Sequence, residues 1–286
     1  MLNGTITTRP LKFLFSIIIF FSCLCGFGQF SKKFEFGNYL ISSGNFIEVL
    51  NYPSIINITQ LSNEQSDSLS FLIGKAHFYN KSFDLAKSSF SSITETSLFG
   101  PAQYYSTLSN LYLGNYGFSN STLLYLPNDG LNTLIKKGDF ILLNNIDSAK
   151  SVTLRKSDFL IQKHFNDLDN VILGIEGHKT KSAFLAGLMS AIIPGSGKFY
   201  AGKVGEGVAS LLMVGILTAS SIEQFNNGGF KNPQFYLMSL PAAFFYVGNI
   251  YGSYFSVKVS NIEFNEQIRN EVLFHLHIPF KSIYRQ

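Results

Sequence analysis

Residues 204–222, VGEGVASLLMVGILTASSI, and residues 235–257, FYLMSLPAAFFYVGNIYGSYFSV, are apolar enough to insert into a membrane. The first run has 19 residues with one charge, Glu206, and the second has 23 residues with none. At about 1.5 Å per residue, either run as a helix would cross a hydrocarbon core about 30 Å thick. The sequence therefore predicts two membrane-spanning helices, joined by a tight polar turn at residues 223–234.

Small side chains on both runs would let the two spans approach closely. They are Ala209, Gly215, Ala219 and Ser220 on the first run, and Gly248, Gly252 and Ser253 on the second. Gly248 and Gly252 also have the spacing of a helix-dimerisation motif. We interpret that spacing first as packing between the two spans, with a homo-oligomer as the alternative.

The N-terminus has the features of a secretory signal peptide over residues 1–28. Arg9 and Lys12 precede the apolar run 13–24, and the small residues Gly26 and Gly28 follow it. Two alternatives are an uncleaved anchor and a lipid-modified Cys23, although the residues before Cys23 fit a lipobox poorly. In all three cases the segment that follows leaves the cytoplasm. Cleavage would also remove the only two cysteines of the chain.

The composition agrees with a membrane protein. Charged residues make up 14% of the chain, against about 25% in ordinary soluble domains, while 29 Phe and 14 Tyr raise the aromatic content to 15%. The formal net charge of +4 is mild and its lysines and arginines form no basic stripe. We therefore expect no nucleic-acid partner.

Between residues 30 and 175 the apolar periodicity is helical and is broken by similar short turns. Gly44-Asn45-Phe46, Lys81-Ser82-Phe83 and Tyr116-Gly117-Phe118 each separate two apolar segments, and their Phe residues are 37 and 35 positions apart. A period in the mid-thirties is typical of helix–turn–helix repeats, which bury their apolar faces only against neighbours. Helices are expected to continue over 131–144 and 157–175, with Gly138-Asp139-Phe140 as a further turn of the same kind.

The segment 71–93 contains the best copy of this pattern. Ile73, Gly74, Ala86 and Phe90 place small residues where two helices cross and a large ring beyond them. These positions resemble the tetratricopeptide repeat family, although Ser70 stands where that family has its Trp-like residue. The resemblance implies a concave surface that binds a partner protein, whose identity stays unknown. The alternative is a generic helical array outside that family.

The stretch from Ser182 to Lys203 is the most distinctive in the chain. Its apolar part, 183–193, is too short to cross as a regular helix and ends at a proline and a glycine. The motif residues Pro194, Gly195, Gly197, Tyr200 and Gly202 resemble the Pro-Gly-x-Gly-x-x-Tyr-x-Gly pattern of small bacterial membrane-hairpin domains. The resemblance covers about 181–260 and implies a membrane unit without catalytic residues.

Two topologies are compatible with this stretch. A re-entrant or interfacial helix would leave the repeats and the C-terminal tail on the same outer side. A crossing segment would instead place Lys198 and Lys203 in the cytoplasm, as the positive-inside rule favours. The shortness of the apolar part slightly favours the re-entrant form.

We found no arrangement of residues that predicts catalysis or cofactor binding. The run from Gly195 to Lys198 is not a phosphate loop, because Ile192 and Phe199 stand where that loop needs Gly and Ser or Thr. His275 and His277 would share one side of a strand, yet no Cys or third His is near in sequence, so no metal site is predicted. His164 with Asp167 and Asp169 is interpreted as a solvated polar turn, and Glu206 is expected to reach the membrane interface.

The sequence thus predicts an all-α protein of the bacterial envelope. The expected domains are a signal peptide (1–28), a tetratricopeptide-like helical repeat domain (29–178), a membrane-hairpin domain (179–260) and a C-terminal tail (261–286). We expect a non-enzymatic scaffold or adaptor held in the lipid bilayer of the inner membrane, with its repeats in the periplasm. The alternative is an accessory subunit of a membrane transport or protein-insertion complex.

Overall fold

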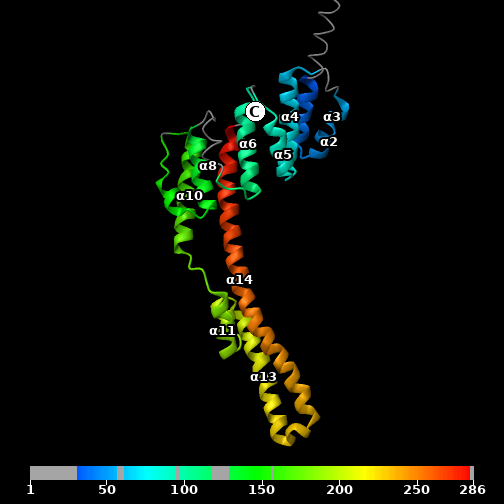
Figure 1. Cartoon of the computed structure of the whole chain (residues 1–286), viewed down its shortest axis with the longest axis vertical. Helices are drawn as coiled ribbons and strands as arrows, with labels where there is room; N and C mark the ends of the chain where they lie inside the picture. Colours follow the sequence, from blue (N-terminus) through cyan, green and yellow to red (C-terminus); the bar gives the residue numbers. More distant parts are fainter. Residues whose placement is uncertain (1–30, 57–60, 95–96, 118–128, 156, 284–286) are drawn as a thin grey trace, which may run out of the picture. The chain divides into compact units, whose positions relative to one another are not determined.

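The computed structural model describes residues 31–56, 61–94, 97–117, 129–155 and 157–283. The structure is all-α, with 82% of it helical, and the described ranges contain no strand, so the predicted all-α class is confirmed (Figure 1). The chain divides into two compact units: residues 1–168 with 273–286, and residues 169–272. The predicted signal peptide lies outside the described residues.

The first unit consists of short helices in sequence order. Residues 31–42 are helical. They are followed by α2 (Phe46–Leu50), α3 (Tyr52–Ile55), α4 (Asn63–Tyr79), α5 (Phe83–Ser91), α6 (Phe99–Tyr112), α8 (Asp129–Leu142) and α9 (Ile146–Ser151). The beginning of α10 (Phe159–Gly177) and the end of α14 (Pro233–Ile283) complete the described part of this unit.

The same helix-terminating turn occurs four times in the described part of the first unit. Its left-handed residue is Gly44, Lys81, Gly114 and Asn144 in turn, so that successive turns are 37, 33 and 30 positions apart. At the second turn the Ser82 N–H donates to the His77 carbonyl (2.9 Å) and the Lys81 N–H donates to the Phe78 carbonyl (3.0 Å). This is the Schellman arrangement, which satisfies the last carbonyls of a helix. Its recurrence is compatible with a helical repeat region.

The turn predicted at Gly138-Asp139-Phe140 was wrong. These residues lie within α8, and the fourth turn is formed by Asn144 and Asn145 instead. Gly138 serves helix packing, because a Cβ there would lie 2.8 Å from the Leu276 side chain.

Neighbouring helices of the first unit pack in series, with α2 against α4, α4 against α5 and α5 against α6. The core between them is largely aromatic. The Phe90 ring stacks on Tyr105 at 5.0 Å, and Phe78 meets the same tyrosine edge to face at 5.1 Å. Such ring pairs bury large apolar areas in specific geometries.

The end of α14 belongs to this core. Leu273, Leu276 and Phe280 are buried, and Phe280 contacts Tyr105 edge to face at 4.5 Å. Their spacing of three and four residues is that of one helix face. The residues predicted to form a C-terminal tail, 261–286, are therefore helical as far as Ile283.

The second unit contains the end of α10, then α11 (Ala183–Ile192), α12 (Ser196–Tyr200), α13 (Val204–Gly228), the 3₁₀ turn η3 (Gly229–Lys231) and α14 up to Val272. Figure 1 shows α13 and the first part of α14 side by side, joined at η3. The predicted polar connector, 223–234, is shorter than expected, because α13 continues to Gly228. Asn232 closes the turn by donating from Nδ2 to the Gln224 carbonyl (3.0 Å).

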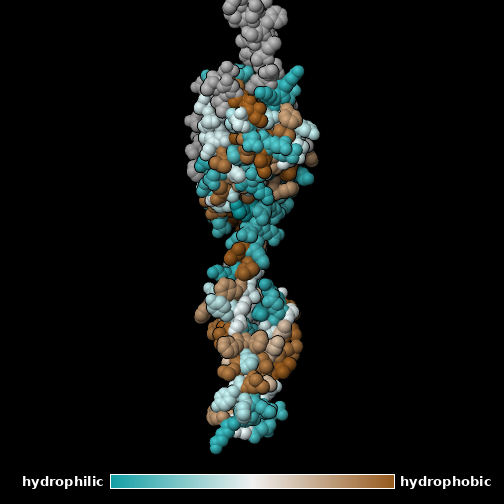
Figure 2. All heavy atoms as spheres, turned by 90° about the vertical axis from the view of Figure 1, so that its right-hand side faces the viewer, coloured by the Kyte–Doolittle hydropathy of each residue, from teal (hydrophilic) through white to brown (hydrophobic). Residues whose placement is uncertain are grey.

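One helix of the described ranges, Val204–Lys231, is long and apolar enough to cross a membrane. Only 11% of its most apolar window is buried in the protein, so it is not an ordinary core helix. Figure 2 shows apolar side chains gathered on the visible face of this unit. Its exposed apolar residues include Val208, Leu211, Leu212, Met213 and Ile216 on α13, and Leu237, Leu240, Phe244 and Val247 on α14.

Candidate functional site

The glycine-rich stretch folds back on itself between α11 and α13. Ser182 caps α11 by accepting the Leu185 N–H (3.3 Å), and its own N–H donates to the Tyr200 hydroxyl (3.2 Å). Tyr200 is the last residue of α12. The segment 183–200 thus begins and ends at the same place.

Gly195 and Gly197 occupy the closest backbone contacts of this unit. Gly195 is left-handed, with φ of +87°, and a Cβ there would collide with the Gly207 carbonyl of α13. At Gly197 an added Cβ would collide with the Ala186 carbonyl of α11. The two glycines therefore let α12 lie against α11 and α13 with no side chain between them.

A buried polar cluster holds the turn. The hydroxyls of Ser190 and Ser253 lie 2.7 Å apart, and both residues are fully buried. Ser190 Oγ also accepts the Gly197 N–H (2.8 Å). Asn249 of α14 accepts the Gly195 N–H (3.0 Å) and donates to the Ser190 carbonyl (3.3 Å). These buried polar groups form hydrogen bonds with one another, as burial requires. The cluster therefore holds the backbone of the turn in place.

The remaining motif residues lie around this cluster. Pro194 stands between the end of α11 and left-handed Gly195. Gly202, with φ of +88°, ends α12 in a Schellman turn in which Lys203 N–H donates to the Lys198 carbonyl (2.9 Å). Outside the motif, the Tyr246 hydroxyl of α14 donates to the Ala191 carbonyl (2.6 Å) and so joins α14 to α11.

Charged groups lie at the start of α13. The Glu206 carboxylate is 3.7 Å from the ammonium of Lys198 and equally far from that of Lys203. Its side chain is 54% exposed, so this pair of contacts is worth little free energy. A cavity of about 570 Å³ opens beside Lys198 and Glu206, with Met213, Phe244 and Phe245 among its apolar walls.

The expected packing of the two spans through small residues was wrong at Gly215 and Gly248. A Cβ at either position would meet nothing within 4 Å. Gly252 faces the Lys198 side chain rather than α13. The close approaches of this unit are those of Gly195 to Gly207 and Gly197 to Ala186.

The predicted repeat residues lie together in the first unit. A Cβ on Gly74 would be 2.6 Å from the Phe90 ring, so α4 and α5 approach where this glycine stands. Ala86 and Phe90 are fully buried, and Ile73 is partly buried against the core around Leu72.

The structure also brings together His164, Asp167 and His275, all in the first unit. The sequence predicted a solvated polar turn for His164 and Asp167 and a strand for His275. Both predictions were wrong, because all three residues lie in helices and the two histidines are buried. His164 and Asp167 are three residues apart, and on a helix this spacing places them on one face of α10. The sequence alone could therefore have shown that these two side chains lie close together. For His275, the helical spacing of the apolar residues around it indicates that it faces the core. The predicted strand would instead have placed alternate residues on opposite sides.

No protein-family model, curated protein or solved structure matches the chain. The resemblances to tetratricopeptide repeats and to bacterial membrane-hairpin domains therefore stay predictions.

Proposed function

We propose that the chain is a non-enzymatic scaffold or adaptor of the bacterial envelope, held in the inner membrane by its second unit. Its first unit would bind a partner protein through the helical repeats on the periplasmic side. The observation that supports this most directly is the combination of a serial helix array with one exposed, membrane-length apolar helix in the same chain.

The membrane part of the proposal includes the hairpin predicted from sequence. Among the residues that the structure describes, α13 with the η3 turn is the one helix that meets the length and hydropathy of a span. Residues 235–257 lie in α14 beside it and expose large apolar side chains such as Leu237, Phe244 and Val247. We propose that they form the second span, since water is a poor solvent for such a surface.

The partner-binding part is supported by exposed apolar side chains on the array. Phe36 and Tyr39 stack on each other at 6.1 Å and are 55% and 62% exposed. Ile47 of α2 and Ile55 of α3 are also exposed. Aromatic side chains of this kind are enriched at protein interfaces.

A photo-crosslinking experiment tests the scaffold proposal. A photoreactive amino acid replaces Tyr39 in the full-length chain, cells are irradiated, and adducts are purified in detergent and identified by mass spectrometry. The same substitution at Phe230, an exposed ring at the η3 turn, is the matched control. We expect an adduct at Tyr39 with one protein that also binds the purified chain and is absent at Phe230. Equal adducts at both sites, or none at either, would contradict the proposal.

The alternative, a subunit of a transport or insertion complex, is favoured by the cavity beside Lys198 and Glu206 in an otherwise apolar unit. Glu206→Gln distinguishes the two functions. If the chain is a scaffold, Glu206→Gln leaves both the Tyr39 adduct and the growth of cells that depend on the protein unchanged. If the chain is a transport subunit, the adduct remains but that growth is lost.

A further inference from the structure

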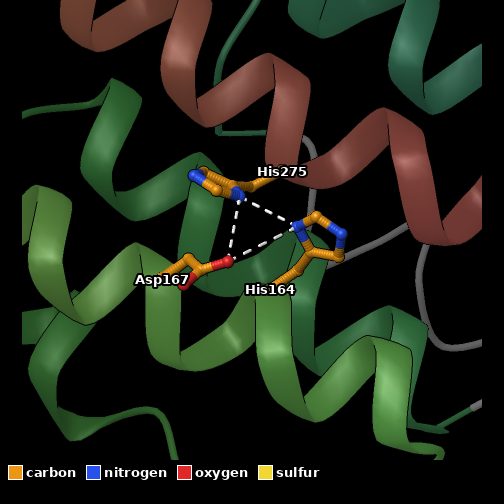
Figure 3. A group of neighbouring side chains, drawn as sticks. All are labelled: His164, Asp167 and His275. Atoms are coloured by element: carbon orange, nitrogen blue, oxygen red, sulfur yellow. Dashed lines mark hydrogen bonds and ion pairs between the residues drawn. The ribbon is translucent and has the colours of Figure 1, made fainter.

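His164, Asp167 and His275 form a compact triangle of metal-ligand atoms in the first unit. The two Nδ1 atoms are 2.9 Å apart, and Asp167 Oδ2 is 3.9 Å from His164 Nδ1 and 3.7 Å from His275 Nδ1. Figure 3 shows the three side chains pointing toward one another, two from α10 and one from α14. Two ligands of a tetrahedral zinc ion, with bonds of about 2.0–2.1 Å, are separated by about 3.3 Å. One of the three distances in the triangle is shorter than this separation and the other two are longer.

The two imidazoles of the triangle are enclosed by the protein. His164 and His275 are 5% and 9% exposed. Asp167 is less enclosed, with 32% of its side chain exposed, so an ion has a route to the triangle from solvent.

We propose that His164 Nδ1, His275 Nδ1 and a carboxylate oxygen of Asp167 bind one divalent transition-metal ion, zinc by preference. Imidazole nitrogens and a carboxylate suit zinc, whereas calcium and magnesium require more oxygen ligands. Three protein ligands leave the fourth tetrahedral position for water or a group from a partner. The ion would join the end of α14 to α10 within the first unit. This inference does not depend on the proposed scaffold function.

Zinc binding can be measured on the purified full-length chain in detergent. The chain carries an affinity tag without histidine and is stripped with a chelator before titration with zinc. We expect one zinc ion per chain after gel filtration and a rise in Tm with zinc concentration, because the ion binds the folded state. Cobalt in place of zinc should give the visible absorption of a tetrahedral site.

Asp167→Ala tests the site with little risk to folding, because this side chain is partly exposed. We expect zinc affinity to fall at least about tenfold. Asp169→Ala is the matched control: it removes an exposed carboxylate two residues away on the same helix and should leave the affinity unchanged. Asp167→Cys should restore binding and add a thiolate-to-cobalt charge-transfer band in the near ultraviolet, which a purely structural role would not produce.

The same distances would arise if the two Nδ1 atoms shared only a proton, one donating and the other accepting. In that case the wild type retains no more zinc than Asp167→Ala, and cobalt gives no tetrahedral spectrum. Either of these results overturns the proposal. Equal zinc affinity in Asp167→Ala and Asp169→Ala would do so as well.

Discussion

At the scale of single residues, the glycine motif is explained by backbone contact rather than by flexibility. Gly197 has an ordinary helical conformation in α12, and the Ala186 carbonyl and the Ser190 hydroxyl exclude a side chain there. Gly195 is excluded twice, by its positive φ and by the Gly207 carbonyl. A flexible linker would show neither constraint.

Gly197→Ala should therefore destabilise the second unit by about 1–3 kcal/mol or more, as overpacking a tight contact does. Gly215→Ala is the control, since its Cβ would meet open space within α13. Thermal unfolding of the full-length chain in detergent measures both. A Gly197→Ala variant as stable as Gly215→Ala would mean that α12 does not lie against α11.

In the first unit, Ala86 and Leu85 are neighbours on α5 with opposite environments. Ala86 is fully buried at the crossing of two helices and Leu85 is 55% exposed. Ala86→Glu should destabilise the chain by about 3 kcal/mol or more, because it buries an unpaired charge. Leu85→Glu should change stability by less than about 0.5 kcal/mol. Chemical denaturation followed by helical circular dichroism compares them, and equal midpoints would show that the repeat register is wrong.

Local sequence was enough to find the residues that act within one turn or one helix pair. Gly195, Gly74 and Ala86 all make their decisive contacts where neighbouring elements in sequence meet. His164 and His275 are 111 positions apart, and nothing local indicates that they lie together. The partner of Gly138, Leu276, is more remote still in sequence. For this reason a glycine that packs against a distant helix was predicted to form a turn.

At the scale of elements, the recurring turn was predictable because it depends on local backbone chemistry. Gly and Asn tolerate the left-handed conformation, and Lys81 adopts it as well, with φ of +61°. The end of α14 was harder to predict. Its apolar residues alternate closely enough in sequence to suggest a strand, yet Leu273, Leu276 and Phe280 form one buried helical face against distant helices.

Helix α13 should hold the chain in the membrane through its exposed apolar surface. The wild type should stay in the membrane fraction after alkaline carbonate washing. Leu212→Lys with Ile216→Lys, both near the middle of α13, should release a large fraction of it, since each charge costs about 2.5–3.5 kcal/mol at the centre of a span. Asn227→Lys, at the polar end of the helix, is the control and should stay bound. Wild-type chain recovered in the carbonate supernatant would contradict the membrane assignment.

At the scale of the whole molecule, the leader predicted from the sequence and the charges near α13 favour opposite orientations. The leader would export everything up to α11. Lys198 and Lys203 would then face the periplasm, whereas the positive-inside rule places such lysines in the cytoplasm. A crossing of residues 183–200 would reconcile the two. The bond between Ser182 and Tyr200 argues against a crossing, because it joins the two ends of that segment.

Within the second unit, a further bond joins two positions that we expect to share a side of the membrane. Asn261 Nδ2 of α14 donates to the Lys181 carbonyl (2.9 Å), while η3 lies at the other end of α13. Exposed residues at Lys179 and Glu263 should therefore lie on one side and Asn227 on the other.

Single cysteines at Lys179, Asn227 and Glu263 test this topology in a chain whose Cys23 and Cys25 are replaced by serine. A membrane-impermeant maleimide added to cells with a permeabilised outer membrane labels only periplasmic cysteines. We expect labelling at Lys179 and Glu263 and protection at Asn227, as an exporting leader and a re-entrant α11 require. Labelling at Lys179 and Asn227 with protection at Glu263 would mean that residues 183–200 cross the membrane. Labelling at Asn227 alone would mean that the leader does not export the repeats and that the positive-inside rule sets the orientation.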